Sequence, residues 1–126
     1  MATAVTYSGD VTVQAHPSFP NLYGTGQITA EGFIHGAFRT ITVTAQTLLA
    51  TDDVVLVSAG GATTTTLLST AATGKRFIIK NIGAGAATIS AGAGTIDGAG
   101  TYSLGTQYDQ ATFLHVGSNV WYVIAE

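Results

Sequence analysis

Polar and apolar residues alternate with a period of two along much of the chain, a pattern that predicts β-strands rather than helices. Residues 40–45 alternate strictly between threonine and apolar side chains, as expected for a strand with one buried face. Val54–Val57 is a continuous run of β-branched residues and leucine, compatible with a strand buried on both faces. No window shows the three-and-four spacing of an amphipathic helix. Further strands are predicted over residues 76–82, 111–116 and 120–124.

Turn-forming residues separate these predicted strands at short intervals, which is typical of an all-β domain. We predict a compact antiparallel β-sandwich or jelly-roll-like barrel over residues 37–126. Residues 1–36 are expected to form an extended N-terminal arm or a short-strand attachment region, with strands at 10–15 and 26–30. This region holds both prolines, and the aromatic residues Phe19, Tyr23, Phe33 and Phe38 lie in it or directly after it. Either these aromatics pack on the domain's own core, or they anchor the arm to a neighbouring subunit or a larger surface.

Residues 83–100 contain six glycines and six alanines, which invites comparison with a phosphate-binding loop. A dinucleotide or P-loop motif needs a helix after the glycines, and here another strand-like segment, Thr88-Ile89-Ser90, follows. We interpret the segment as tight turns joining two short strands centred on Ile89 and Ile96. Asp97-Gly98 is a favoured pair for a two-residue hairpin turn.

The chain carries little charge for a soluble domain. Only 9% of its 126 residues are charged and the formal net charge is −3, which argues against a nucleic-acid partner. The apolar runs are too short to span a membrane. There is no cysteine, so disulfides and thiolate chemistry are absent. A surface this poor in charge is expected to be buried in part against partner molecules.

Catalytic and metal-binding patterns are also absent from the sequence. No nucleophile elbow occurs, and the three histidines lie far apart in the chain. His115 is expected to point outward from a strand or to be hydrogen-bonded. Asp52-Asp53 is interpreted as a turn before a strand rather than a calcium site. The threonines of residues 40–44 and 63–66 resemble the arrays of ice-binding solenoids, but a solvated strand face accounts for them. We predict no enzymatic activity, no cofactor and no metal site.

From about residue 42 to 124 the sequence resembles a small β-rich domain found in bacteriophage virion proteins, including the C-terminal domains of tail-fibre proteins. The resemblance depends on the order of four segments. They are TLLATDDVVLV (47–57), TTTTLLSTAATGKRFIIKNIG (63–83), ATISAGAGTIDG (87–98) and ATFLHVGSNVWYVIAE (111–126). It implies a non-enzymatic structural role and a homotrimer.

A chain of this length is short for a whole fibre, which favours a small capsid cement or head decoration protein. We expect a homotrimer on the outer surface of the phage head that binds and stabilises the major capsid protein shell. Phe19, Tyr23 and Phe33 are the expected capsid contacts. Two alternatives stay open: a short tail-fibre or receptor-binding tip that contacts host surface glycan, and a free secreted domain that binds sugars or ice.

Overall fold

The computed structural model describes residues 37–126, and this part of the chain is all-β, as predicted. It contains ten strands and no helix. The strands are β1 (Phe38–Ile41), β2 (Ala45–Thr47), β3 (Val54–Val57), β4 (Thr63–Thr66), β5 (Arg76–Asn81), β6 (Ala87–Ser90), β7 (Thr95–Ile96), β8 (Thr101–Leu104), β9 (Gln110–Gly117) and β10 (Val120–Ala125).

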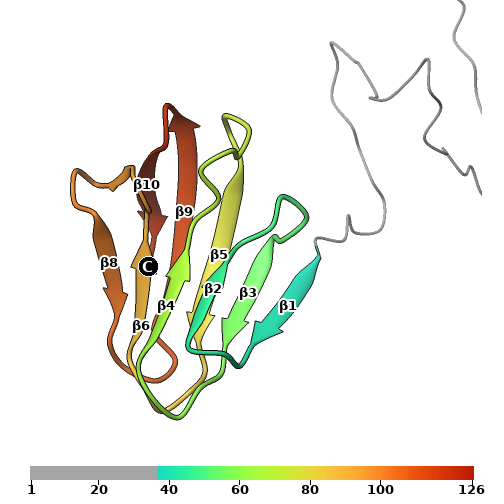
Figure 1. Ribbon diagram of the computed structural model, residues 1–126, viewed down its shortest axis with the longest axis vertical. Helices are drawn as coiled ribbons and strands as arrows, with labels where there is room; N and C mark the ends of the chain where they lie inside the picture. Colours follow the sequence, from blue (N-terminus) through green and yellow to red (C-terminus); the bar gives the residue numbers. More distant parts are fainter. Residues whose placement is uncertain (1–36) are drawn as a thin grey trace, which may run out of the picture. The chain divides into compact units, whose positions relative to one another are not determined.

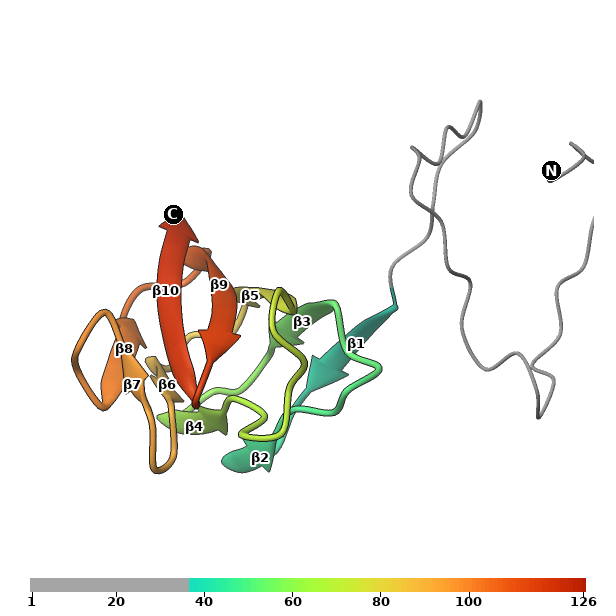
Figure 2. The ribbon, with the colours of Figure 1, turned by 90° about the horizontal axis from the view of Figure 1, so that it is seen from above.

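The strands form two sheets, and the chain passes from one sheet to the other at each step from β1 to β6. The six-stranded sheet has the order β1-β3-β5-β9-β10-β7, and the four-stranded sheet has the order β2-β4-β6-β8. Because β1, β3 and β5 are mutually parallel, as are β2, β4 and β6, the chain winds through three turns of a flattened coil (Figures 1 and 2). The antiparallel strands β8, β9 and β10 then extend both sheets.

The predicted antiparallel arrangement is therefore wrong for most of the described strands. Five of their eight pairings are parallel and three are antiparallel. Parallel neighbours need a crossover connection, which is usually a helix. Here a strand of the opposite sheet provides the crossover for four of the five parallel pairs, and β7 connects to β10 through β8 and β9. The sequence therefore contains no helical segment that would have indicated parallel pairing.

A single hydrophobic core fills the space between the inner faces of the two sheets. Phe77 of β5 and Trp121 of β10 lie stacked with ring centroids 5.6 Å apart, and both are fully buried. Ile89 of β6 faces them from the four-stranded sheet, also fully buried. In β3 only Val55 and Val57 are buried, whereas the two residues that alternate with them are half-buried on the outer face. The prediction that this strand is buried on both faces is wrong.

The predicted strand over residues 40–45 is a corner between the sheets. β1 ends at Ile41 and β2 begins at Ala45, and the connection between them crosses from one sheet to the other. Ile41 is buried, but Val43, the next apolar residue of the alternation, is 51% exposed. The alternation alone could not distinguish a continuous strand from two short strands joined at an exposed bend.

The glycine-rich segment 83–100 has the predicted form. Ile89 lies in β6 and Ile96 in β7, and both side chains are fully buried. Asp97 (φ 49°) and Gly98 (φ 82°) form the two-residue turn, closed by a hydrogen bond from the Ala99 amide to the Ile96 carbonyl. Gly85 has a further role, because a Cβ there would lie 2.0 Å from the Gly61 carbonyl oxygen. The turns of successive coils thus stack backbone against backbone.

Two hydroxyl groups face the core without a hydrogen-bond partner among the described residues. Thr63 and Thr65 of β4 point inward, while Thr64, between them, points to solvent. A buried hydroxyl that forms no hydrogen bond has lost its hydration without compensation. These side chains therefore oppose folding rather than support it.

We predict that Thr65→Val raises the free energy of unfolding by about 1 kcal/mol, because valine fills nearly the same space without the unpaired hydroxyl. Urea denaturation of the full chain measures this change. Thr64→Val, on the exposed side of the same strand, is the matched control and should change stability by less than about 0.5 kcal/mol. A destabilised Thr65→Val variant would contradict the prediction.

Candidate functional site

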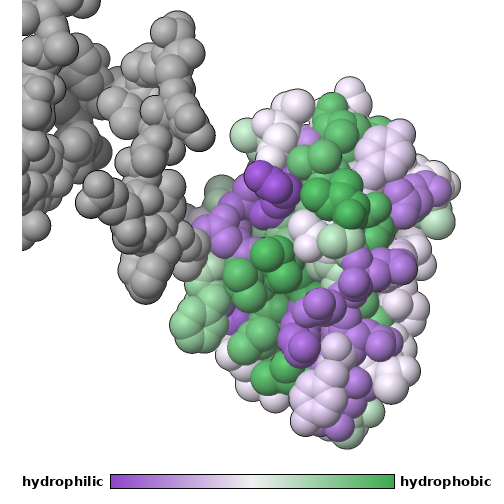
Figure 3. All heavy atoms as spheres, turned by 180° about the vertical axis from the view of Figure 1, so that it is seen from behind, coloured by the Kyte–Doolittle hydropathy of each residue, from purple (hydrophilic) through white to green (hydrophobic). Residues whose placement is uncertain are grey.

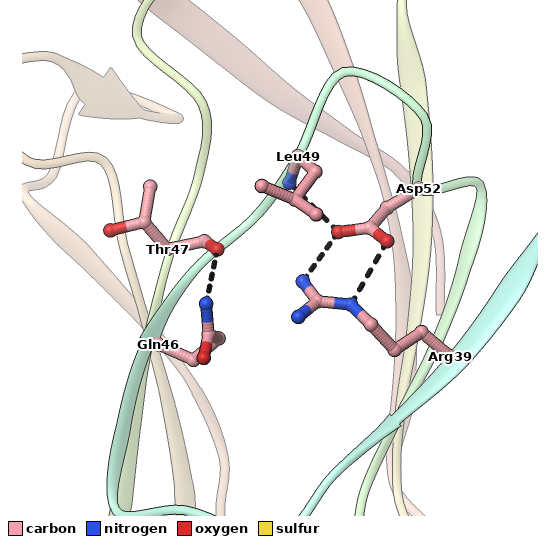
Figure 4. A network of polar contacts seen from close by, with 5 residues as sticks. All are labelled: Arg39, Gln46, Thr47, Leu49 and Asp52. Atoms are coloured by element: carbon pink, nitrogen blue, oxygen red, sulfur yellow. Dashed lines mark hydrogen bonds and ion pairs between the residues drawn. The ribbon is translucent and has the colours of Figure 1, made fainter.

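The two adjacent aspartates hold the connection before β3 in place, and each forms an ion pair with a different basic side chain. Asp52 is buried and accepts two hydrogen bonds from Arg39 of β1, at 3.0 Å from Nε and 2.6 Å from Nη2 (Figure 4). It also accepts one from the Leu49 amide, at 2.8 Å. Asp53 pairs with Lys75, whose hydrogen bond, followed by that of the Ala37 amide, lowers the pKa of the carboxyl group. The predicted turn is confirmed, and both side chains are committed to structural contacts.

His115 also has a structural environment. Its ring is buried, 4.6 Å from the Trp121 ring between centroids, and its Nδ1 atom lies 3.2 Å from the Ala72 carbonyl oxygen. Of the two expectations for this residue, the hydrogen-bonded one is confirmed and the outward-pointing one is wrong. Within residues 37–126, no three histidine or carboxylate side chains converge as a metal site would require. The expected capsid contacts Phe19, Tyr23 and Phe33 lie outside the described residues and stay predictions.

The outer face of the six-stranded sheet is the first candidate surface. In β1, β3 and β5, Phe38, Val54 and Ile78 stand side by side in register, and Leu114 pairs with Tyr122 between β9 and β10. Figure 3 shows this side of the molecule, with hydrophobic groups gathered in patches that polar residues separate. A sheet face exposed to water is normally polar. We call this surface the apolar face, comprising Phe38, Val54, Leu56, Ile78, Leu114, Tyr122 and Ile124.

A shallow hollow of about 380 Å³ lies within the apolar face between β5, β9 and β10. Ile78 and Ile124, which are 43% and 49% exposed, form part of its wall together with Thr112 and Ala125. The remaining lining residues carry charges of opposite sign, Asp53 and Arg76. The hollow could receive an apolar side chain of a partner.

The outer face of the four-stranded sheet carries hydroxyl groups instead. Strand pairing, parallel from β2 to β6 and antiparallel between β6 and β8, aligns them in two rows, which the linear sequence did not reveal. The threonines of residues 40–44 are exposed, as predicted, whereas in β4 the prediction holds only for alternate residues, since Thr63 and Thr65 are buried. The rows consist of Ala45, Thr64, Thr88 and Ser103, and of Thr47, Thr66, Ser90 and Thr101.

A second hollow of about 380 Å³ lies where β8 ends and β9 begins, and we call it the tyrosine hollow. The Tyr102 hydroxyl donates a hydrogen bond to Glu126, and Tyr108, in the connection between the two strands, is 63% exposed. Asp109 accepts a hydrogen bond from the Thr106 amide at 2.8 Å, which closes the turn that presents Tyr108. The lining residues are Tyr102, Ser103, Leu104, Tyr108, Asp109, Gln110 and Glu126.

Sequence analysis did not single out the tyrosine hollow, and β8, which supplies three of its residues, was not among the predicted strands. The segment Gly105–Gln110 has the composition of an ordinary polar loop. The one available signal was Tyr108 itself, a tyrosine in a turn where asparagine or glycine is usual. The backbone angle of Tyr108 cannot be predicted from the sequence.

Comparisons with known proteins identify no relative: no protein-family model matches the chain, and no curated protein matches it. In the part of the chain that the structure describes, there is no helix with the length and apolar character needed to cross a membrane.

The hydrogen bond to Glu126, together with desolvation, raises the pKa of Tyr102 to about 12. Because the protonated phenol is favoured in the folded state, its contribution to stability is complete below pH 10 and is lost as the pH rises from about 10 to about 12. Spectrophotometric titration should show one tyrosine ionising near pH 12, and Tyr102→Phe should remove this step. Glu126→Gln, which keeps an acceptor but removes the charge, should move it toward pH 10. An unchanged titration in both variants would contradict the assignment.

Proposed function

We propose that the protein is a non-enzymatic structural component of a bacteriophage virion: a homotrimeric head decoration or cement protein. Its compact β-sandwich subunits would bind the outside of the head and stabilise the major capsid protein shell. The apolar face is the observation that carries the role in assembly. The virion setting and the trimer rest on the sequence resemblance of residues 42–124.

Exposure of the apolar face to water would be costly, and contact with another protein would remove that cost. Phe38 and Tyr122 are 71% and 48% exposed. Ile78 and Ile124 line the hollow of the apolar face. Exposed patches of large apolar side chains of this kind are typical of protein–protein interfaces. Large aromatic and aliphatic residues that fill a partner's hollow provide most of the binding free energy in such interfaces.

The sheet edges support the same role. β1 and β2 stand at the ends of their sheets, and among residues 37–126 each pairs with a strand on one side only. Unpaired edges tend to associate with other strands unless charge or a covering segment prevents it. β1 holds a single charge, Arg39, and that charge is bound to Asp52. A neighbouring subunit could therefore cover the edge without burying a free charge there.

We predict that Ile78→Asp weakens self-association at least about 100-fold, because it places a carboxylate in the centre of the apolar face. Sedimentation of the full chain across a micromolar concentration series measures the trimer–monomer equilibrium. Val43→Asp is the matched control: Val43 is similarly exposed, at 51%, but lies in the connection between β1 and β2. It should leave the trimer intact.

Thermal unfolding followed by circular dichroism must show that Ile78→Asp remains folded. A wild-type protein that is monomeric at all these concentrations would refute the trimer. A folded Ile78→Asp variant that associates like the wild type would show that the interface between subunits lies outside the apolar face.

We also predict that density for this protein appears on the outer surface of the phage head, at threefold positions of the capsid lattice, when purified virions are imaged at subunit resolution. Deletion of residues 1–25, which removes Phe19 and Tyr23, should abolish attachment to capsids. Val43→Asp, which leaves this segment whole and lies outside the apolar face, serves as the control and should still attach. Density on the tail instead would favour the alternative, a short tail-fibre or receptor-binding tip. Decoration by the truncated protein would exclude the segment as the attachment site.

A further inference from the structure

We propose that the tyrosine hollow is a binding site for a neutral sugar residue of a glycan, with Tyr108 as the aromatic platform on which the sugar ring packs. The site is independent of the proposed role in capsid assembly. It shares no lining residue with the hollow of the apolar face.

Tyr108 has an unfavourable backbone conformation that the fold maintains. Its φ angle is 74°, in the left-handed region, where asparagine and glycine are common and bulky residues are rare. Such conformations are strained and cluster at ligand-binding and active sites. The side chain held in this way is not buried but 63% exposed, so core packing does not account for the strain.

Several hydrogen bonds fix the backbone that presents this side chain. The Tyr108 amide donates to the Asn81 carbonyl at 2.6 Å, and the Asn81 amide donates to the Asp109 carbonyl at 2.8 Å. The buried Asn81 side chain also donates to the carbonyl of Thr106, at 3.3 Å. Gln107 Nε2 reaches the Ile82 carbonyl at 3.0 Å. The backbone that carries Tyr108 is therefore held in place before a ligand arrives, which reduces the entropic cost of binding.

The polar groups around the platform suit a sugar. Ser103, Gln110 and the carboxylates of Asp109 and Glu126 line the hollow and offer hydrogen-bond donors and acceptors for hydroxyl groups. One face of a pyranose ring is largely C–H and packs on an aromatic ring, while its hydroxyls need polar partners at the edge. A shallow hollow with one exposed aromatic residue and several polar groups provides both.

The charge of the hollow selects among sugars. Its lining residues include two acidic side chains and no basic one. The Lys80 ammonium lies over the Tyr108 ring, 6.0 Å from its centroid. With this one cation and the two carboxylates, the net charge around the hollow is negative, which disfavours acidic sugars, so neutral hexoses are the expected ligands.

The test uses the full-length protein on an array of oligosaccharides. Neutral oligomers of glucose, galactose, mannose and N-acetylglucosamine are compared with sialylated and uronic-acid oligomers. Hits are then measured by calorimetry. We expect binding to at least one neutral oligomer and none to the acidic ones. Choline is included because two tyrosines and two carboxylates could also hold a small cation.

Two substitutions at one position separate binding from folding. Tyr108→Asn removes the platform but accepts the left-handed conformation, so it should be at least as stable as the wild type and bind the neutral oligomer at least about tenfold more weakly. Tyr108→Trp keeps an aromatic platform and should retain binding. Full affinity in Tyr108→Asn, binding of choline alone, or binding of no neutral oligomer would overturn the proposal. None of these outcomes depends on the trimer or on the virion.

Discussion

Parallel pairing without helices is the constraint on which this structure depends. To pair β3 parallel to β1, the chain must return to the end where β1 began, and it does so through β2 in the opposite sheet. The same path repeats through β4, so each turn of the coil supplies one strand to each sheet. A core between the sheets follows directly, because every strand has one inner face. Tight corners follow as well, since successive turns must stack at the spacing of neighbouring strands.

The glycines of segment 83–100 show how this stacking determines local sequence. A side chain at Gly83 or Gly85 would collide with the backbone of Ala59 or Gly61, one coil earlier. The sequence correctly indicated tight turns and the burial of Ile89 and Ile96, because small residues and isolated isoleucines are local signals. It could not indicate which earlier turn lies against these glycines. That contact is set by the winding, which joins residues more than twenty positions apart.

The same distinction explains what sequence could predict of the candidate surfaces. The strands Val54–Val57 and Val120–Ala125 were predicted almost to the residue, because their apolar content is local. The neighbours of these strands in the sheet were not predicted, so the alignment of Phe38, Val54 and Ile78 across three parallel strands could not be predicted either. The tyrosine hollow was missed for a related reason: Tyr102 and Glu126 are 24 positions apart in the sequence and are brought together only by the fold. A backbone angle such as that of Tyr108 results from tertiary contacts with Asn81, not from its neighbours in sequence.

The few charges of the chain are consistent with different roles for the apolar face and the tyrosine hollow. All five carboxylates among the described residues accept a hydrogen bond from within the chain: Asp52, Asp53, Asp97, Asp109 and Glu126. Arg39 and Lys75 are each bound to an aspartate. Arg76 and Lys80 have no such partner among the described residues and stand on either side of Ile78 in β5, so it is the exposed apolar side chains of this face, rather than a lack of charge, that favour association. The tyrosine hollow differs, because its two carboxylates and its exposed aromatic ring stand together at one end of the strands. The two sites adjoin, because Gln110 and Glu126 of the tyrosine hollow also line a hollow with Ile78 and Ala125, but the polar groups that would bind a sugar belong to the tyrosine hollow.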